Sequence, residues 1–263
     1  EAALGRALAS QGLLADAERA LRASLARAPS IDAYETLMTI DVQTDRFVEA
    51  QRWADEALAL LGDRSSGDRY RRAKLERLLA DALRRGGHPR AAATRYVSAL
   101  RTWAQLGESK DLPRAIAGER ALDMARAMWW LGDAGKAVEL AMQALDDDPG
   151  SDALAASAVV FLLEAGRYRD AVDALHRCLR EPEIGAYFKT YMSLWVIGDA
   201  RGRGEPPDRQ ATEYLARRRG PAWYERLAQL AAGTAGLAEL APLATTGPRR
   251  AELTFYAVTL GQI

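Results

Sequence analysis

The sequence predicts an all-α protein, from its composition and from its hydrophobic pattern. Roughly one in five of the 263 residues is alanine, whereas valine, isoleucine and threonine are sparse. Alanine loses no side-chain entropy in a helix and β-branched residues do, so this balance favours helix over strand. Apolar residues also recur at helical spacing. About half of the chain is hydrophobic, enough to bury a substantial core at this length.

Five segments of the chain repeat one pattern. Each begins with a turn residue, places an alanine five residues later, and places a small residue followed by a leucine seven residues after that alanine. Small residues at these two positions let one helix approach its neighbours closely. The five repeated alanines are Ala17, Ala50, Ala92, Ala137 and Ala171.

The period of this pattern resembles the tetratricopeptide repeat family, whose helix-turn-helix units recur every 34 residues. The turn residues Gly132 and Gly166 are 34 residues apart, while the two units before them are stretched. The match is weaker in the first helices, as at Asp41, where the family prefers a large apolar residue. The resemblance implies a right-handed α-α superhelix with a concave groove lined by the first helix of each unit.

The domain organisation follows from the repeat. Residues 1–182 are predicted to form about five helix-turn-helix units, with these boundaries: 1–29, 30–62, 67–105, 112–149 and 150–182. Residues 183–263 lose the regular pattern and are predicted to form a degenerate sixth unit followed by capping helices, because a terminal unit must shield its outer face.

The C-terminal third carries a second resemblance. Trp195 stands in a leading helix, a Pro-x-Trp sequence follows, and Glu252, Phe255, Tyr256 and Gly261 close the chain. This arrangement resembles bacterial NlpI-like lipoproteins with tetratricopeptide repeats. It implies a bacterial protein and a periplasmic location, although the cysteine content allows the cytoplasm as well.

Composition argues against several classes of function. Thirty-six basic and thirty-six acidic residues cancel, so no net field favours nucleic acid. No apolar run is long enough to cross a bilayer. Two histidines and one cysteine offer no zinc-binding spacing, and the acidic run at 146–148 lacks a calcium-loop pattern. We expect no catalytic residue, metal or cofactor.

The only cysteine, Cys178, stands two residues after His176. Two residues along a helix turn the side chains by about 200°, so the two cannot act as nucleophile and base. Cys178 occupies the small packing position of its unit and is predicted to be a buried, inert thiol. His176 is then expected on the solvent or at a helix interface.

The groove is the predicted binding surface. Counting back from the repeated alanines places one stripe of each first helix on it. The second unit contributes Asp32, Glu35, Thr39 and Val42, and the fourth begins its stripe with Glu119 and Leu122, whereas Ala153 and Ala156 begin the fifth. The candidate partner-binding residues are Lys74, Arg77, Asp81, Arg84, Arg126, Trp129, Val160 and Leu163.

The stripes change along the chain from acidic in the second repeat unit to basic in the third and apolar in the fifth. Arg77, Arg84 and Arg126 could hold carboxylates of a partner, with Trp129 as an aromatic anchor. A solvated charged face is the alternative. The apolar stripe of the fifth unit needs a cover. We expect the C-terminal helices to supply it; a partner's helix or peptide, or a second copy in a homo-oligomer, are the alternatives.

We therefore expect a non-enzymatic scaffold that binds a protein or peptide ligand in its groove. The alternative is the sensor or regulatory part of a larger signalling or transcription-regulating protein, since stretched units also occur in such repeat domains.

Overall fold

The computed structural model describes residues 2–62, 65–106 and 113–261, and within these ranges the chain forms helices and no strand. It divides into two compact units. The first comprises residues 1–111 and 123–137, and the second comprises 112–122 and 138–263. The predicted fold class, an all-α array of helix-turn-helix pairs, is confirmed within each unit.

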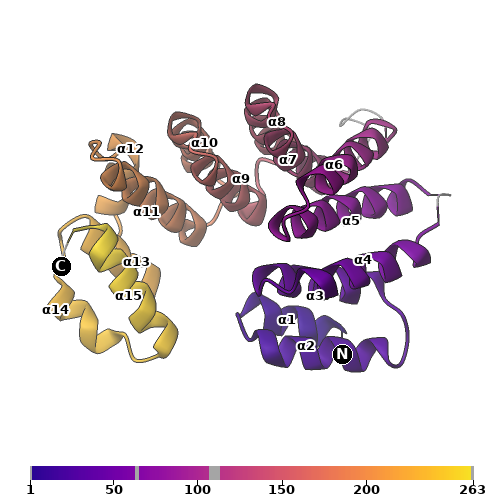
Figure 1. Ribbon diagram of the computed structural model, residues 1–263. Helices are drawn as coiled ribbons and strands as arrows, with labels where there is room; N and C mark the ends of the chain where they lie inside the picture. Colours follow the sequence, from indigo (N-terminus) through magenta and orange to yellow (C-terminus); the bar gives the residue numbers. More distant parts are fainter. Residues whose placement is uncertain (1, 63–64, 107–112, 262–263) are drawn as a thin grey trace. The chain divides into compact units, whose positions relative to one another are not determined.

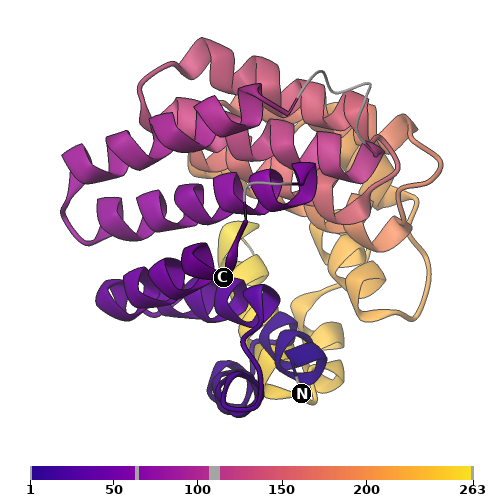
Figure 2. The same cartoon turned by 90° about the vertical axis from the view of Figure 1, so that its right-hand side faces the viewer.

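The first unit begins with three antiparallel helix pairs, and Figures 1 and 2 both show the last of them, α5 and α6, running side by side. Two further helices, α7 (Arg114–Trp130) and α8 (Ala134–Asp147), cross the division between the units. The six helices of the three pairs are α1 (Ala2–Ser10), α2 (Leu14–Leu25), α3 (Ile31–Gln43), α4 (Phe47–Leu60), α5 (Ser66–Arg85) and α6 (Pro89–Ala104).

The second unit continues with the pair α9–α10 and then departs from the regular pattern. Helix α11 packs against both α9 and α10, and the C-terminal helices α13 and α15 pack on α11 (Figure 1). The elements are α9 (Asp152–Glu164), α10 (Tyr168–Arg180), α11 (Ala186–Gly202), α12 (Arg209–Ala216), α13 (Trp223–Ala231), α14 (Leu237–Leu240), the 3-10 helix η2 (Ala241–Leu243) and α15 (Gly247–Thr259).

The predicted boundaries of the repeat units stay a prediction, and the one at residue 112 lies outside the described residues. The helices nevertheless begin with local signals. Side chains of Ser30, Ser65 and Ser151 accept a hydrogen bond from a backbone N–H in the first turn of α3, α5 and α9. These caps satisfy donors that a helix start otherwise leaves unpaired.

Each turn within a pair contains one residue in the left-handed region of backbone conformation. Glycine holds this place in most pairs, as at Gly87 with φ 83° and Gly166 with φ 67°. In the second pair the residue is Asp45, with φ 59°. Aspartate tolerates this conformation better than most residues with a side chain. The sequence thus specifies each chain reversal locally, through the residue at the turn.

The repeated alanines are the contact points between helices. Four of them are fully buried, namely Ala17, Ala50, Ala137 and Ala171, and the fifth, Ala92, is 2% exposed. A larger side chain at any of them would push two helices apart.

Asp41 shows how the chain accommodates a charge at an apolar position of the pattern. Its carboxylate is fully buried in the described structure, accepts a hydrogen bond from Trp53 Nε1 at 2.9 Å, and pairs with the Arg46 guanidinium at 2.5 Å. Arg46 also donates to Glu18 at 2.7 Å. Burial still raises the pKa of Asp41, against the opposing effects of Arg46 and Trp53. The position is filled by a bonded polar group in place of a hydrophobic one.

The C-terminal helix α15 lies on a defined face of α11. Gly204 is the left-handed residue after α11, and counting back thirteen, ten and six residues, as for the groove stripes, gives Tyr191, Leu194 and Gly198. A Cβ at Gly198 would meet the Thr259 methyl group at 2.6 Å. Helix α15 therefore covers the face of α11 that corresponds to the groove face of the earlier pairs.

No helix among the described residues combines the length and the apolar character that crossing a membrane requires.

Candidate functional site

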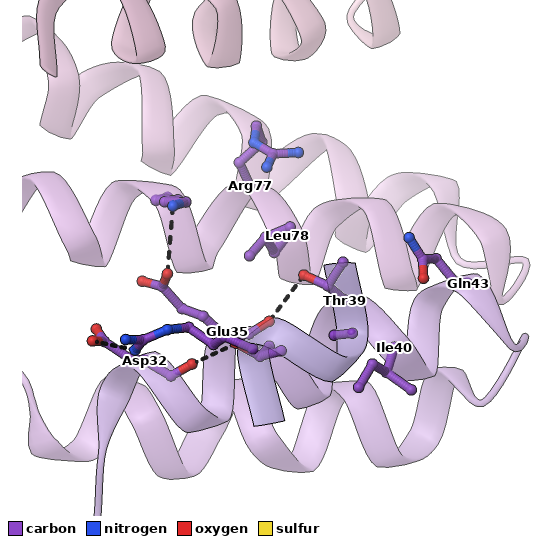
Figure 3. Close-up of a pocket in the computed structure, with 11 residues that line it drawn as sticks. Asp32, Glu35, Thr39, Ile40, Gln43, Arg77 and Leu78 are labelled. Atoms are coloured by element: carbon purple, nitrogen blue, oxygen red, sulfur yellow. Dashed lines mark hydrogen bonds and ion pairs between the residues drawn. The ribbon is translucent and has the colours of Figure 1, made fainter. Parts of the chain in front are cut away.

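A pocket of about 650 Å³ lies along the first helices of the three pairs in the first unit. Figure 3 shows that side chains from α3 and α5 point into it from opposite walls. Helix α1 supplies the third wall. The lining residues are Arg6, Ala9, Asp32, Glu35, Thr36, Thr39, Ile40, Gln43, Lys74, Arg77 and Leu78.

Much of the pocket lining consists of residues that the sequence predicts to face the groove. Asp32, Glu35 and Thr39 belong to the stripe predicted for the second repeat unit, residues 30–62. Lys74 and Arg77 belong to the stripe predicted for the third repeat unit, residues 67–105. The predicted stripes do not include α1. The same spacing, six and three residues before the left-handed Gly12, gives Arg6 and Ala9, which both line the pocket. A signal for them was therefore present in the sequence.

The charges of the pocket alternate from helix to helix and neutralise one another. Arg6 of α1 donates to Asp32 of α3 at 2.9 Å, and Arg71 of α5 lies 3.4 Å from the other oxygen of Asp32. Lys74 Nζ lies 3.4 Å from Glu35 Oε2. The acidic and basic stripes that the sequence predicts thus face each other across the pocket.

The two ion pairs of Asp32 are weakly held. The side chains of Arg6, Asp32 and Arg71 are each nearly half exposed. Pairs this exposed contribute about 0–1 kcal/mol, so a ligand's charges can replace them at little cost.

Glu35 is the more enclosed of the two pocket carboxylates, with 17% of its side chain exposed. Burial raises its pKa, and the nearby Lys74 ammonium only partly offsets that effect. The hydroxyls beside it are already engaged, since Thr36 donates to the Asp32 carbonyl and Thr39 to that of Glu35 (Figure 3). A charged ligand would therefore pair with Lys74 and Glu35, or with Arg6 and Asp32, and not with the threonine hydroxyls.

Arg77 differs from its predicted role. Its side chain is only 7% exposed, and its guanidinium lies 2.6 Å from Asp81 and 3.0 Å from Asp123 of α7. Asp81 also accepts a hydrogen bond from the Tyr96 hydroxyl at 2.5 Å. Both carboxylates around Arg77 belong to the protein itself, so Arg77 links α5 to the middle of α7 and is not free to hold a partner's carboxylate.

The other arginines of the predicted set are also engaged. The Arg84 guanidinium lies 3.4 Å from the ring centroid of Trp130, and Arg126 pairs with Asp123 at 3.2 Å. Trp130 is 46% exposed, whereas Trp129, the predicted anchor, is half-buried. The exposed tryptophan that contacts an arginine is thus Trp130, the residue after the predicted anchor Trp129.

Val160 and Leu163 of the predicted set lie in α9 of the second unit and are half-buried. In the same stripe Ala156 is buried and Ala153 is exposed. The eight candidate residues therefore divide between the two compact units. Of these eight, the structure brings only Lys74 and Arg77 into the pocket of Figure 3.

Cys178 and His176 serve the packing of the second unit. Cys178 is 2% exposed, and burial raises the pKa of its thiol to about 11. His176 Nε2 lies 3.0 Å from Asp208 Oδ1, and the same Asp208 oxygen accepts the Ala211 N–H at the start of α12. His176 thus stands at a helix interface, one of its two expected settings.

Comparisons with known proteins bear on the fold. No family model matches the sequence, and no curated protein matches it. Among solved structures, a Rap protein complexed with competence and sporulation factor matches with a TM-score of 0.53 and 19% identity, covering 98% of this chain and 71% of that one. PilF of Pseudomonas aeruginosa matches with a TM-score of 0.45 and 15% identity, over 86% of this chain and 93% of that one.

A third match is YrrB, described as a tetratricopeptide repeat protein with an unusual peptide-binding site. Its TM-score is 0.34 and its identity 17%, over 68% of this chain and 82% of that one. The likeness to the Rap protein agrees with the helix-pair architecture, and the chain has a helical-repeat fold. The likeness of the C-terminal third to NlpI-like lipoproteins stays a prediction.

Proposed function

We propose that this protein is a non-enzymatic bacterial scaffold that binds a protein or peptide segment in the pocket formed by α1, α3 and α5. The observation that carries the proposal is the pocket's lining. Charges of both signs stand on its walls in ion pairs, those of Asp32 being nearly half exposed, and Ala9, Ile40 and Leu78 add apolar lining. A peptide offers the matching mixture of charged and apolar groups.

The ligand chemistry follows from the pairs that it would replace. A carboxylate of the ligand would take the place of Glu35 beside Lys74, and a cationic group would take the place of Arg6 beside Asp32. The Rap protein of similar fold was crystallised with competence and sporulation factor, which supports a binding role for such helix arrays. The alternative role, as the regulatory part of a larger signalling protein, stays a prediction.

The proposal is tested by selecting ligands from a randomised peptide library and measuring their affinity by calorimetry. Thr39 lines the pocket and is exposed, so Thr39→Trp should obstruct the pocket and weaken the selected peptides at least about tenfold. The matched control is Val48→Trp, which adds the same ring at a position that is 79% exposed on α4. It should leave the affinity unchanged.

A second variant changes charge without loss of the ion pair. The double exchange Glu35→Lys with Lys74→Glu keeps one acid opposite one base and should leave the melting temperature within a few degrees. It should still lower the affinity of charged peptides at least about tenfold, because each ligand group would then meet a like charge. If Thr39→Trp and the double exchange both bind the peptides normally, the pocket is not the binding site.

A further inference from the structure

A second pocket, of about 590 Å³, lies in the second compact unit between α11 and α15. Most of its lining is aromatic. Helix α11 supplies Tyr187, Phe188, Tyr191 and Trp195, and helix α15 supplies Ala251, Glu252, Phe255 and Tyr256.

The rings form one connected cluster. The Tyr191 ring lies 4.8 Å from that of Tyr187 and 6.4 Å from that of Tyr256, centroid to centroid, so the contacts run from one helix to the other. Two rings at the mouth remain open to solvent: Tyr187 is 50% exposed and Phe255 is 58% exposed. Clustered exposed rings of this size mark binding surfaces more often than inert ones.

Among the described residues that line this pocket, Glu252 is the only charged one. One oxygen of its carboxylate accepts a hydrogen bond from Trp223 Nε1 at 2.7 Å. Burial, then a side-chain hydrogen bond to Glu252 and the charge of that carboxylate, raise the pKa of Tyr191. In the ranges that the structure describes, no lysine, arginine or histidine forms an ion pair with Glu252. A negative charge therefore stands among aromatic rings without a direct ion pair, and the nearby Arg249 guanidinium lies 5.5 Å from the centroid of the Trp223 ring.

At two other places in the chain, an arginine lies near an aromatic ring and also donates a hydrogen bond to a carboxylate. The Arg22 guanidinium lies 5.3 Å from the Trp53 ring centroid and donates to Glu18 at 2.7 Å. Arg203 lies 5.6 Å from the Tyr168 ring and donates to Asp199 at 2.7 Å. A guanidinium suits such settings because its flat face stacks on a ring while its edge bonds a carboxylate.

We propose that the pocket between α11 and α15 binds an arginine side chain presented by a peptide segment of a partner protein. The guanidinium lies against the rings and donates to Glu252, which keeps its bond to Trp223. Apolar residues beside the arginine pack on the exposed rings of Tyr187 and Phe255. The site belongs to the second unit and does not depend on the pocket of Figure 3.

The experiment titrates the full chain with three acetylated, amidated tripeptides, Leu-Arg-Leu, Leu-Lys-Leu and Leu-citrulline-Leu, and follows the indole N–H signals of Trp195 and Trp223 by NMR. We expect saturable shifts with the arginine peptide at millimolar concentration. The citrulline peptide, which has the same shape without the charge, should bind at least about tenfold more weakly, and the lysine peptide should fall between them.

The variants separate charge from ring contact. Glu252→Gln keeps an acceptor for Trp223 and should weaken the arginine peptide at least about fivefold, and Phe255→Ala removes an exposed ring without opening the core. Glu164→Gln, an exposed change of the same charge in α9, is the matched control and should bind normally. Circular dichroism melting confirms that each variant is folded.

Three outcomes would overturn the proposal. They are equal binding of the arginine and citrulline peptides, normal binding by Glu252→Gln, and absence of saturation with the arginine peptide. Sedimentation without peptide tests a further occupant: self-association that Glu252→Gln abolishes would assign the pocket to a second copy of the chain and would also overturn it.

Discussion

The helix pairs of the first unit and the helices α9–α12 of the second use the same backbone pattern with different core chemistry. In the first unit, Asp41, Glu76, Arg77 and Asp123 are all buried, and each has an oppositely charged partner. In α9–α12, every residue of which is described, the buried polar groups are hydroxyls such as Ser193, which donates to its own helix backbone.

The difference shows what the repeat pattern specifies and what it leaves open. In α9 and α10 the small residues Ala171 and Cys178 are buried together with large apolar side chains such as Leu162 and Leu175. In the first unit the same small residues are supplemented by charge pairs that only one alignment of neighbouring helices satisfies. Buried pairs add little net stability, but breaking one of them is costly. The two regions should therefore respond differently to substitution.

The largest effect is expected on the reactivity of Cys178, which reports opening of the second unit. A thiol reagent at pH 8 should modify native protein at least about a thousandfold more slowly than protein in strong denaturant, because the thiol is buried and its pKa is raised to about 11. Mass spectrometry over time measures the rate. Rapid modification of the native chain would show that α9–α12 is not held by packing as described.

The next effect is the loss of a buried charge partner in the first unit. Arg77→Ala leaves Asp123 and Asp81 close together without their shared cation and should lower the free energy of unfolding by about 3–5 kcal/mol. Urea denaturation measures the change. The double variant Arg77→Met with Asp123→Leu also removes one of the two carboxylates and should recover part of the loss. Equal stability of Arg77→Ala and the wild type would place this arginine on the surface.

A smaller effect is expected from overfilling the contact between α11 and α15. Gly198→Ala adds a methyl group at 2.6 Å from the Thr259 methyl. Overpacking costs about 1–3 kcal/mol, and the better helix propensity of alanine returns about 1 kcal/mol, so a net loss of roughly 1 kcal/mol is expected. Adding Thr259→Ser removes the clash and should restore at least wild-type stability. A single variant more stable than the wild type by about 1 kcal/mol, the full gain in helix propensity, would mean that α15 does not meet α11 at Gly198.

The smallest effect concerns Glu35. Because its pKa is raised in the folded state, the folded protein binds more protons than the unfolded chain just above pH 4, and stability falls as pH rises through the folded pKa. Glu35→Gln removes this loss and should slightly stabilise the protein at pH 7, with no gain near pH 3. Thermal melts across this range measure it. A large loss at pH 7 would instead make the Lys74 pair a stabilising one.

Much of the fold was predictable because its determinants are local. The left-handed turn residues, the serine caps and the buried alanines each act within one or two helix turns. The turn residue and the buried alanine also keep a fixed spacing of five residues in each pair. The same spacing predicts that Asp32, Glu35, Lys74 and Arg77 face the groove, and extending it to the first helix identifies Arg6 as well.

The sequence by itself thus determined the helix pairs, their packing residues and the face that each first helix turns to the groove. Only the tertiary structure decided which charges on those faces meet. Periodicity gives the direction of a side chain but not its distance from one on another helix, so it could not show that Arg77 is enclosed by Asp81 and Asp123. Nor could it show that Glu252, sixty-one residues after Tyr191, stands beside that ring without a direct ion pair, because that meeting depends on how α15 packs on α11.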